Sequence, residues 1–134
     1  MADAAIGSIG HGLVVLVGVG PADDAVAADR LAQRVADVRI FADEAGRTNR
    51  SLIDVGGAAL VISQFTLFAD TRRGRRPGFT GAASADLARA CYERFCDALA
   101  ATGVPVERGR FGAGMAVELV NDGPFTIWID SAAG

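Results

Sequence analysis

The first clear pattern in the chain is a continuous apolar segment followed by apolar positions at helical spacing. Gly12 to Val19 is apolar at every position, which predicts a strand buried on both faces of a sheet. Pro21 and Asp23 come next, and both favour the start of a helix. The buried stripe of that helix is expected at Ala27, Leu31, Val35 and Val38.

Shorter elements fill the middle of the chain. Residues 42–48 indicate a turn region, residues 50–55 a short strand, and Gly56–Gly57 a tight turn. Residues 58–67 predict a second apolar strand. This strand contains two adjacent polar residues near its end, Ser63–Gln64, which is uncommon where a strand is buried.

The remainder of the chain predicts one helix and three strands. An arginine-rich loop at 70–81 precedes the helix, for which Ser84 is a suitable N-cap and Gly103 a suitable C-terminal stop. The buried stripe of this helix comprises Leu87, Cys91, Phe95 and Leu99, and the strands are expected at 104–108, 114–120 and 125–130. The order strand, helix, strands, helix, strands predicts a mixed α/β fold in a single domain that spans residues 1–134.

The composition is that of a compact domain. The chain has 134 residues, 51% of them hydrophobic, which is enough for a core without metal or disulfide support. Its longest apolar run, Leu13 to Val19, is far shorter than the ~20 residues that cross a bilayer. Met1 to Ala5 lack the basic residues of a secretory signal. Cys91 and Cys96 would lie roughly 140° apart around a helix and are expected to be buried free thiols. We therefore expect a soluble, cytoplasmic protein with no membrane partner.

Most of the usual catalytic groups are missing from the sequence. His11 is the single histidine, and lysine does not occur, so neither a Schiff base nor a phosphate-binding-loop lysine is available. No histidines and cysteines have the spacing of metal ligands. The glycine-rich segment 7–12 precedes a strand and does not open a helix, so it does not fit a dinucleotide-binding loop. We expect neither a metal nor an organic cofactor.

The basic residues are unusual in kind and in distribution. The net charge is −3 and all 13 basic residues are arginine. Four of them are close together in one loop: Arg72, Arg73, Arg75 and Arg76. Guanidinium groups suit phosphate recognition, whereas composition alone favours a solvated loop.

Two polar segments stand out against their surroundings. Ser63-Gln64-Phe65-Thr66-Leu67 ends an apolar strand, and Asn121-Asp122-Gly123-Pro124-Phe125-Thr126 separates two strands. Each has an ordinary explanation, the first as a strand end whose hydroxyls bond to the backbone, the second as a hairpin turn. Together, however, they resemble the two signature motifs of the D-aminoacyl-tRNA deacylase family.

The resemblance extends over nearly the whole chain, from Ile6 to Asp130. Further similar segments are Ile9 to Val19, Arg39-Ile40-Phe41 followed by Asn49, Asp70 to Pro77, and Gly109-Arg110-Phe111-Gly112 followed by Met115. The resemblance implies a three-layer α/β fold with a mixed β-sheet core and two main helices. The family has a further strand before the point at which this chain starts, and an arginine in it steadies the Gly-Pro motif. We therefore expect that strand to be absent, with lower stability and weaker chiral discrimination; the smaller departures are Thr48, Gly78 and Gly114.

The resemblance implies hydrolysis of the ester bond of D-aminoacyl-tRNA, and also of glycine mischarged on tRNA. The reaction passes through an oxyanion that preorganised N–H groups stabilise. The catalytic environment would be formed by Ser63, Gln64, Phe65 and Thr66, with backbone amides at least as important as side chains. Thr66 is a nucleophile candidate by its chemistry, but no base accompanies it. The family relies instead on water and on the 2′-hydroxyl of the substrate ribose.

The resemblance also implies a homodimer. Gly123–Pro124, with Asn121 beside it, would form a cis turn that enters the partner's site and rejects L side chains by steric clash. Phe79, Phe111 and Met115 are candidates for the pocket of the terminal adenine, with ordinary core packing as the alternative. The arginine loop would contact the tRNA backbone. Two other functions stay open: a deacylase for a different mischarged tRNA, and a catalytically silent, dimeric RNA-binding homologue.

Overall fold

The computed structural model describes residues 7–131; residues 1–5, expected to carry no secretory signal, lie outside that range. The fold is mixed α/β, as predicted. Its elements follow one another as β1 (Gly12–Val17), α1 (Ala25–Asp37), β2 (Phe41–Ala42), β3 (Thr48–Arg50), β4 (Ala58–Ser63), the 3₁₀-helix η1 (Phe65–Phe68), α2 (Ala85–Ala101) and β5 (Val106–Arg108).

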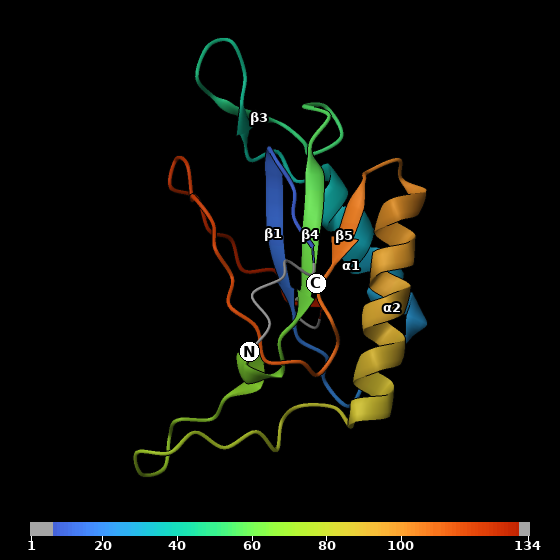
Figure 1. Ribbon diagram of the computed structural model, residues 1–134, viewed down its shortest axis with the longest axis vertical. Helices are drawn as coiled ribbons and strands as arrows, with labels where there is room; N and C mark the ends of the chain where they lie inside the picture. Colours follow the sequence, from blue (N-terminus) through green and yellow to red (C-terminus); the bar gives the residue numbers. More distant parts are fainter. Residues whose placement is uncertain (1–6, 132–134) are drawn as a thin grey trace.

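The main sheet contains three parallel strands in the order β1-β4-β5. Gly12 pairs with Ala58 at one end of β1, and Val17 pairs with Ser63 at the other. All three strands therefore run in the same direction, and their carboxyl ends meet at one edge of the sheet, the lower edge in Figure 1. In open α/β sheets this edge is where ligands bind.

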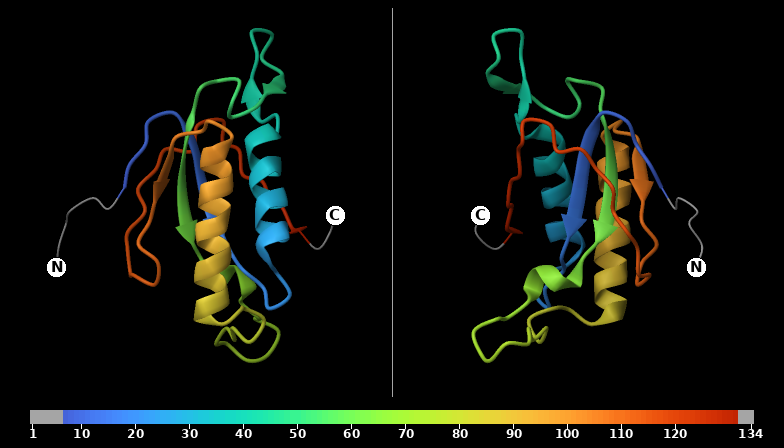
Figure 2. Two further views of the ribbon diagram at one scale, coloured as in Figure 1. Left: turned by 90° about the vertical axis from the view of Figure 1, so that its right-hand side faces the viewer. Right: turned by 60° about the vertical axis from the view of Figure 1, so that its left-hand side comes forward.

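Both helices cover the same face of the sheet and pack side by side (Figure 2). Small residues make their close approach possible, because Ala32, Ala36 and Cys96 are fully buried between them. Side chains alternate across a strand, so Ala59 and Val61 of β4 complete the same core, in which both are also fully buried. The two cysteines are buried free thiols, as the sequence predicted.

The boundaries of α2 confirm the predicted signals. The Ser84 side chain accepts a hydrogen bond from Leu87 N at 3.4 Å, and the helix ends just before Gly103, which has a φ of +98°. Its predicted stripe is buried at Cys91, Phe95 and Leu99. The stripe of α1 is displaced from the predicted one: the buried residues are Ala28, Ala32, Val35 and Ala36, while Ala27, Leu31 and Val38 are half-buried.

The prediction that the first strand is buried on both faces is wrong. β1 lies at the edge of the sheet and ends at Val17. Its helix-facing residues Leu13 and Val15 pack against the core, but Leu16 on the opposite face is 47% exposed. A continuous apolar run cannot reveal which face of an edge strand receives cover.

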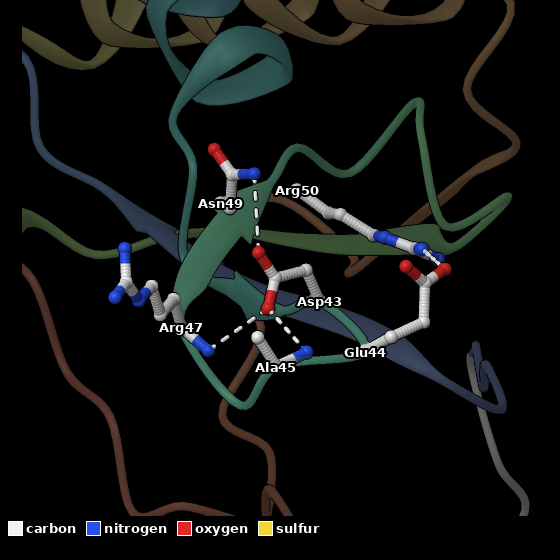
Figure 3. Close-up of polar contacts among 6 residues, drawn as sticks. All are labelled: Asp43, Glu44, Ala45, Arg47, Asn49 and Arg50. Atoms are coloured by element: carbon white, nitrogen blue, oxygen red, sulfur yellow. Dashed lines mark hydrogen bonds and ion pairs between the residues drawn. The ribbon is translucent and has the colours of Figure 1, made fainter.

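The prediction of a strand over residues 50–55 is also wrong. The strand there is β3, which pairs with β2 around a loop built on Asp43 (Figure 3). The Asp43 carboxylate accepts hydrogen bonds from Ala45 N at 2.9 Å and Arg47 N at 3.0 Å. These bonds, the one from Arg47 N most of all, hold the pKa of Asp43 below its ordinary value. Ser51 then starts a turn in which Ser51 N donates to the Asp54 carboxylate and Asp54 N donates to Ser51 Oγ.

The largest correction concerns the last two predicted strands. Residues 114–120 and 125–130 form no strand in the structure. Their alternating apolar residues favour an extended chain, but a strand requires a hydrogen-bonding neighbour. Within residues 7–131, neither segment pairs with another strand, and residues 114–128 are exposed throughout.

Candidate active site at the carboxyl ends of the strands

The predicted catalytic segment lies at the carboxyl edge of the sheet, but not as a continuous strand. β4 ends at Ser63, and Gln64 turns the chain with φ −137° and ψ 86° into η1. Gln64 N still donates to Val17 O at 2.8 Å, which ties the turn to the end of β1. The strand end therefore holds the start of η1 in a fixed position.

Two backbone N–H groups at this turn have no acceptor in the described part of the chain. They belong to Phe65 and Thr66, the first residues of η1. The next amide, Leu67 N, donates to Gln64 O at 3.3 Å, so the unsatisfied donors are those expected at a helix start. Neighbouring amides of this kind can bind an oxygen that carries negative charge.

The side chains of the motif offer polar contacts but no general base. The amide group of Gln64 donates to Thr66 Oγ1. In residues 7–131, the hydroxyl of Thr66 has no histidine or carboxylate within hydrogen-bonding distance. The nucleophile role of Thr66 therefore gains no support from its surroundings.

Aromatic rings border the turn on two sides. Phe65 and Phe79 form an edge-to-face pair with 5.0 Å between ring centroids, and Phe65 is 55% exposed. On the opposite side of η1, Phe68 lies against Gly18. A Cβ atom at Gly18 would come within 3.0 Å of Phe68 Cε2 and 3.1 Å of Leu67 Cβ. Gly18 thus lets η1 approach the end of β1.

The other two candidate pocket residues lie on the β5 side. Phe111 contacts Tyr92 with 6.0 Å between ring centroids. Met115 lies over Gly109 beside Ile62, since a Cβ at Gly109 would meet Met115 Sδ at 3.3 Å and Ile62 Cγ1 at 3.5 Å. The structure therefore places Phe79 beside Phe65, and Phe111 and Met115 in the segment that follows β5.

The buried hydroxyl of Tyr92 joins the two strands that frame this edge. It donates to Val61 O at 2.8 Å and approaches Gly109 O at 3.3 Å. Burial raises the pKa of Tyr92 to about 12. Tyr92 therefore links β4 and the end of β5 to α2 as a neutral hydrogen-bond donor.

The arginine loop divides into one paired and three unpaired residues. Arg72 forms a bidentate ion pair with Asp70, at 2.9 and 2.8 Å, and this bond lowers the pKa of Asp70. Arg73, Arg75 and Arg76 are exposed and have no carboxylate partner in residues 7–131. These three guanidinium groups remain available to a phosphate backbone.

The structure does not bring the Gly-Pro turn to the predicted site. The orange-red segment that contains the turn reaches the end of the sheet opposite η1, in Figure 1 and in both views of Figure 2. The Asn121 side chain accepts a hydrogen bond from Phe125 N at 3.1 Å and donates to Thr126 Oγ1 at 3.2 Å.

The prediction of a cis bond in this turn is wrong for this structure. No cis peptide occurs in residues 7–131, so Gly123–Pro124 is trans, and both residues are exposed. Gly123 has a φ of +144°, which suits glycine. Apart from its two chain neighbours, a Cβ at Gly123 would meet only Phe125 of the same turn within 4 Å among residues 7–131.

Sequence reasoning missed two residues that shape this edge, Gly18 and Tyr92. A glycine within an apolar strand is a signal for a close approach, so Gly18 could have been found. Tyr92 is the single tyrosine of the chain and lies beside the predicted stripe of its helix, but its bond to Val61 O depends on tertiary packing.

The chain is similar over most of its length to proteins of one family. Residues 1–130 match the family described as D-Tyr-tRNA(Tyr) deacylase. A D-aminoacyl-tRNA deacylase of Thermomicrobium roseum is 60% identical over 127 residues, 95% of this chain and 82% of the relative. One of Paracoccus denitrificans is 59% identical over 129 residues, 96% of this chain and 87% of the relative.

Solved structures show the same fold. The c-Myc DNA unwinding element binding protein is 34% identical, with a TM-score of 0.82 over 89% of this chain and 81% of that chain. A probable eukaryotic D-amino acid tRNA deacylase is 19% identical and has a TM-score of 0.68 over 78% of this chain and 76% of that chain, a likeness of fold alone. By sequence and by structure, the chain belongs to the D-Tyr-tRNA(Tyr) deacylase family.

Proposed function

We propose that this enzyme hydrolyses the ester bond of D-aminoacyl-tRNA at the carboxyl end of β4. Family membership supports the reaction. The observation that supports its place in the molecule is the pair of unsatisfied amides, Phe65 N–H and Thr66 N–H, at the edge where parallel strands end.

In the proposed reaction, water attacks the ester carbonyl carbon. The carbonyl oxygen becomes an oxyanion, which accepts hydrogen bonds from the amides of Phe65 and Thr66. The bond from the carbonyl carbon to the ribose oxygen then breaks, and a proton passes to that oxygen, so that a free amino acid and tRNA are released. The 2′-hydroxyl of the same ribose is the group that we propose to assist the proton transfer, as the resemblance to the family implies. In residues 7–131 no side-chain base contacts the Thr66 hydroxyl.

Glycine attached to tRNA is a second proposed substrate. Its α-carbon carries no side chain, so a steric filter against L side chains does not exclude it. We also propose that the enzyme works in the cytoplasm, because aminoacyl-tRNA is used there. None of the helices within residues 7–131 is long and apolar enough to cross a membrane.

A homodimer would complete the site. The segment that contains the Asn121 to Pro124 turn reaches the end of its own chain's sheet that is opposite η1, so a second copy is the source from which such a turn could reach Phe65. The turn-bearing segment also exposes large apolar residues: Val117, Leu119, Val120, Phe125, Ile127 and Trp128. Exposed apolar surface of this kind is typical of interaction sites.

The test is hydrolysis of D-aminoacyl-tRNA and L-aminoacyl-tRNA that carry the same amino acid, measured side by side with purified protein. We expect release of the D-amino acid and little release of the L-amino acid. Turnover of neither substrate together with tight tRNA binding would favour the catalytically silent RNA-binding protein. Preference for the L-form would indicate a deacylase for another mischarged tRNA.

A further inference from the structure

Arg89 is an exposed arginine near the proposed site that has no carboxylate partner in residues 7–131. It lies in the first two turns of α2, and its guanidinium carbon is 4.8 Å from the centroid of the Phe111 ring. Asp86 precedes it by one helical turn, yet forms no ion pair with it. The ring is thus the contact that orients this guanidinium.

The Phe111 ring is itself held in place. Tyr92 packs against it at 6.0 Å between centroids, and the Tyr92 hydroxyl is bonded to Val61 O in the centre of the sheet. The ring quadrupole attracts a guanidinium held at this distance, and none of the five Arg89 N–H donors has an acceptor within residues 7–131. Arg89 is therefore a cation of restricted orientation whose donors remain available.

A second unpaired arginine lies beside this pair. Arg110 directly precedes Phe111, is exposed, and makes no ion pair within the described residues. By contrast, Arg94 and Arg108 are paired with Asp29 and Asp97. Two arginines that form no ion pair in the described residues, Arg89 and Arg110, thus lie next to Phe111 in space or in sequence.

We infer that Arg89, with Arg110 beside it, binds phosphate groups of the tRNA 3′ end on the β5 side of the site. The planar fork of an arginine matches a phosphate, and the substrate is a polyanion whose phosphates must pass close to the reacting ester. The first turns of α2 and the loop with Arg73, Arg75 and Arg76 emerge at the same end of the sheet as η1 (Figures 1 and 2). The 3′ end therefore lies between two groups of arginines.

This inference rests on the proposed function. Two substrates distinguish a failure of the proposed phosphate contact at Arg89 from a failure of the proposed deacylase function. One is D-aminoacyl-tRNA, and the other is 3′-D-aminoacyl-adenosine, which carries the same ester without any phosphate. For Arg89→Gln we expect KM for the tRNA substrate to rise about 5- to 10-fold with kcat nearly unchanged. The slope of log KM against log salt should fall by about 0.7–0.9, the effect of one lost phosphate contact. Hydrolysis of the adenosine ester should be unaffected.

Two further variants serve as controls. Arg30→Gln removes the same charge from an exposed arginine of α1 that forms no ion pair with any residue from 7 to 131, and it should leave both substrates unaffected. Arg89→Lys keeps the charge without the planar fork, so it should restore KM in part. An equal loss on both substrates would assign Arg89 a purely structural role and overturn the inference, as would no loss on either.

A wild-type enzyme that hydrolyses neither ester would contradict the proposed function instead. The binding of uncharged tRNA by wild-type protein and by Arg89→Gln would then still test the inference. Weaker, less salt-dependent binding by the variant supports it, and equal binding overturns it.

Discussion

At the scale of single residues, the proposed chemistry depends on two backbone N–H groups more than on any side chain. Phe65 N–H and Thr66 N–H are aimed by the turn after β4 and lack acceptors in the described residues. Side-chain substitutions leave such donors intact. A direct test must remove an N–H group from the backbone.

Proline at position 65 removes one of these donors with little strain. The position is the first of η1, where proline is favoured, and Gln64 before it is outside the helical region that a following proline disfavours. We expect Phe65→Pro to lower kcat about 100-fold or more relative to Phe65→Ala, which loses the same ring but keeps the N–H. The measurement is single-turnover hydrolysis of D-aminoacyl-tRNA. Equal rates for the two variants would rule out an oxyanion role for the Phe65 amide.

Thr66→Ala should retain substantial activity. Its N–H group remains, and the variant loses only a hydroxyl that accepts a hydrogen bond from Gln64. We expect a rate within about fivefold of wild type, the scale of one ordinary hydrogen bond. Loss of a true nucleophile costs on the order of 10⁶-fold in hydrolases that use one. A loss of that size, with folding and tRNA binding intact, would revive the nucleophile role of Thr66.

Tyr92 should make stability depend on pH in the alkaline range. The pKa of Tyr92 is about 12 in the folded protein and about 10 in the unfolded chain. The stability that Tyr92 contributes is therefore fully present below pH ~10 and is lost as the pH rises toward 12. Urea unfolding at pH 8 and pH 11 should therefore show a decline that is smaller in Tyr92→Phe. At pH 8 that variant should be about 1 kcal/mol less stable, because Val61 O and Gly109 O lose a donor. Tyrosinate absorbance reports the titration directly, since the chain has one tyrosine; ionisation near pH 10 in the folded protein would contradict the prediction.

At the scale of elements, local signals predicted the helices better than the strands. Ser84 and Gly103 marked both ends of α2 because caps act within a few residues. The state of residues 114–130 depends instead on a hydrogen-bonding neighbour elsewhere in the molecule, which alternation along the chain cannot reveal. For the same reason, the sequence indicated that Ser63 to Thr66 lie at the end of an apolar strand. It did not indicate that β4 stops at Ser63 and that Phe65 and Thr66 belong to η1.

The position of η1 relative to β1 should control activity. Gly18→Ala places a Cβ 3.0 Å from the ring of Phe68 and 3.1 Å from Leu67 Cβ, so η1 must shift by a few tenths of an ångström. A displacement of ~1 Å in a catalytic group can cost 10²-fold in rate, so for this smaller shift we expect kcat/KM to fall about 3- to 10-fold with a small change in Tm. Gly10→Ala is the matched control, because a Cβ there meets nothing within 4 Å. Similar activity in both variants would show that the contact between Gly18 and Phe68 does not position the site.

At the scale of the whole molecule, the proposed site is divided between two distant regions. The amides of Phe65 and Thr66 lie at one end of the sheet, and the Gly123–Pro124 turn belongs to a segment that reaches the other end. Leu16 and the apolar residues of 114–128 are also left exposed on this chain. A symmetric dimer would explain both features, because a twofold axis can bring opposite ends of two chains together.

Subunit mixing tests that arrangement directly. Phe65→Pro damages the amide half of the site, and Gly123→Val damages the turn half, since Gly123 has a φ of +144° and a side chain there would intrude on the substrate. Each variant alone should be inactive if every site combines Phe65 of one subunit with Gly123 of the other. After the two proteins are unfolded together and refolded at equal concentrations, half of the dimers are mixed, and one site in each mixed dimer has two intact halves. Activity should therefore return to about a quarter of the wild-type value. Light scattering on the same samples should show dimers; a fully active monomer, or no recovery on mixing despite dimer formation, would place the whole site within one chain.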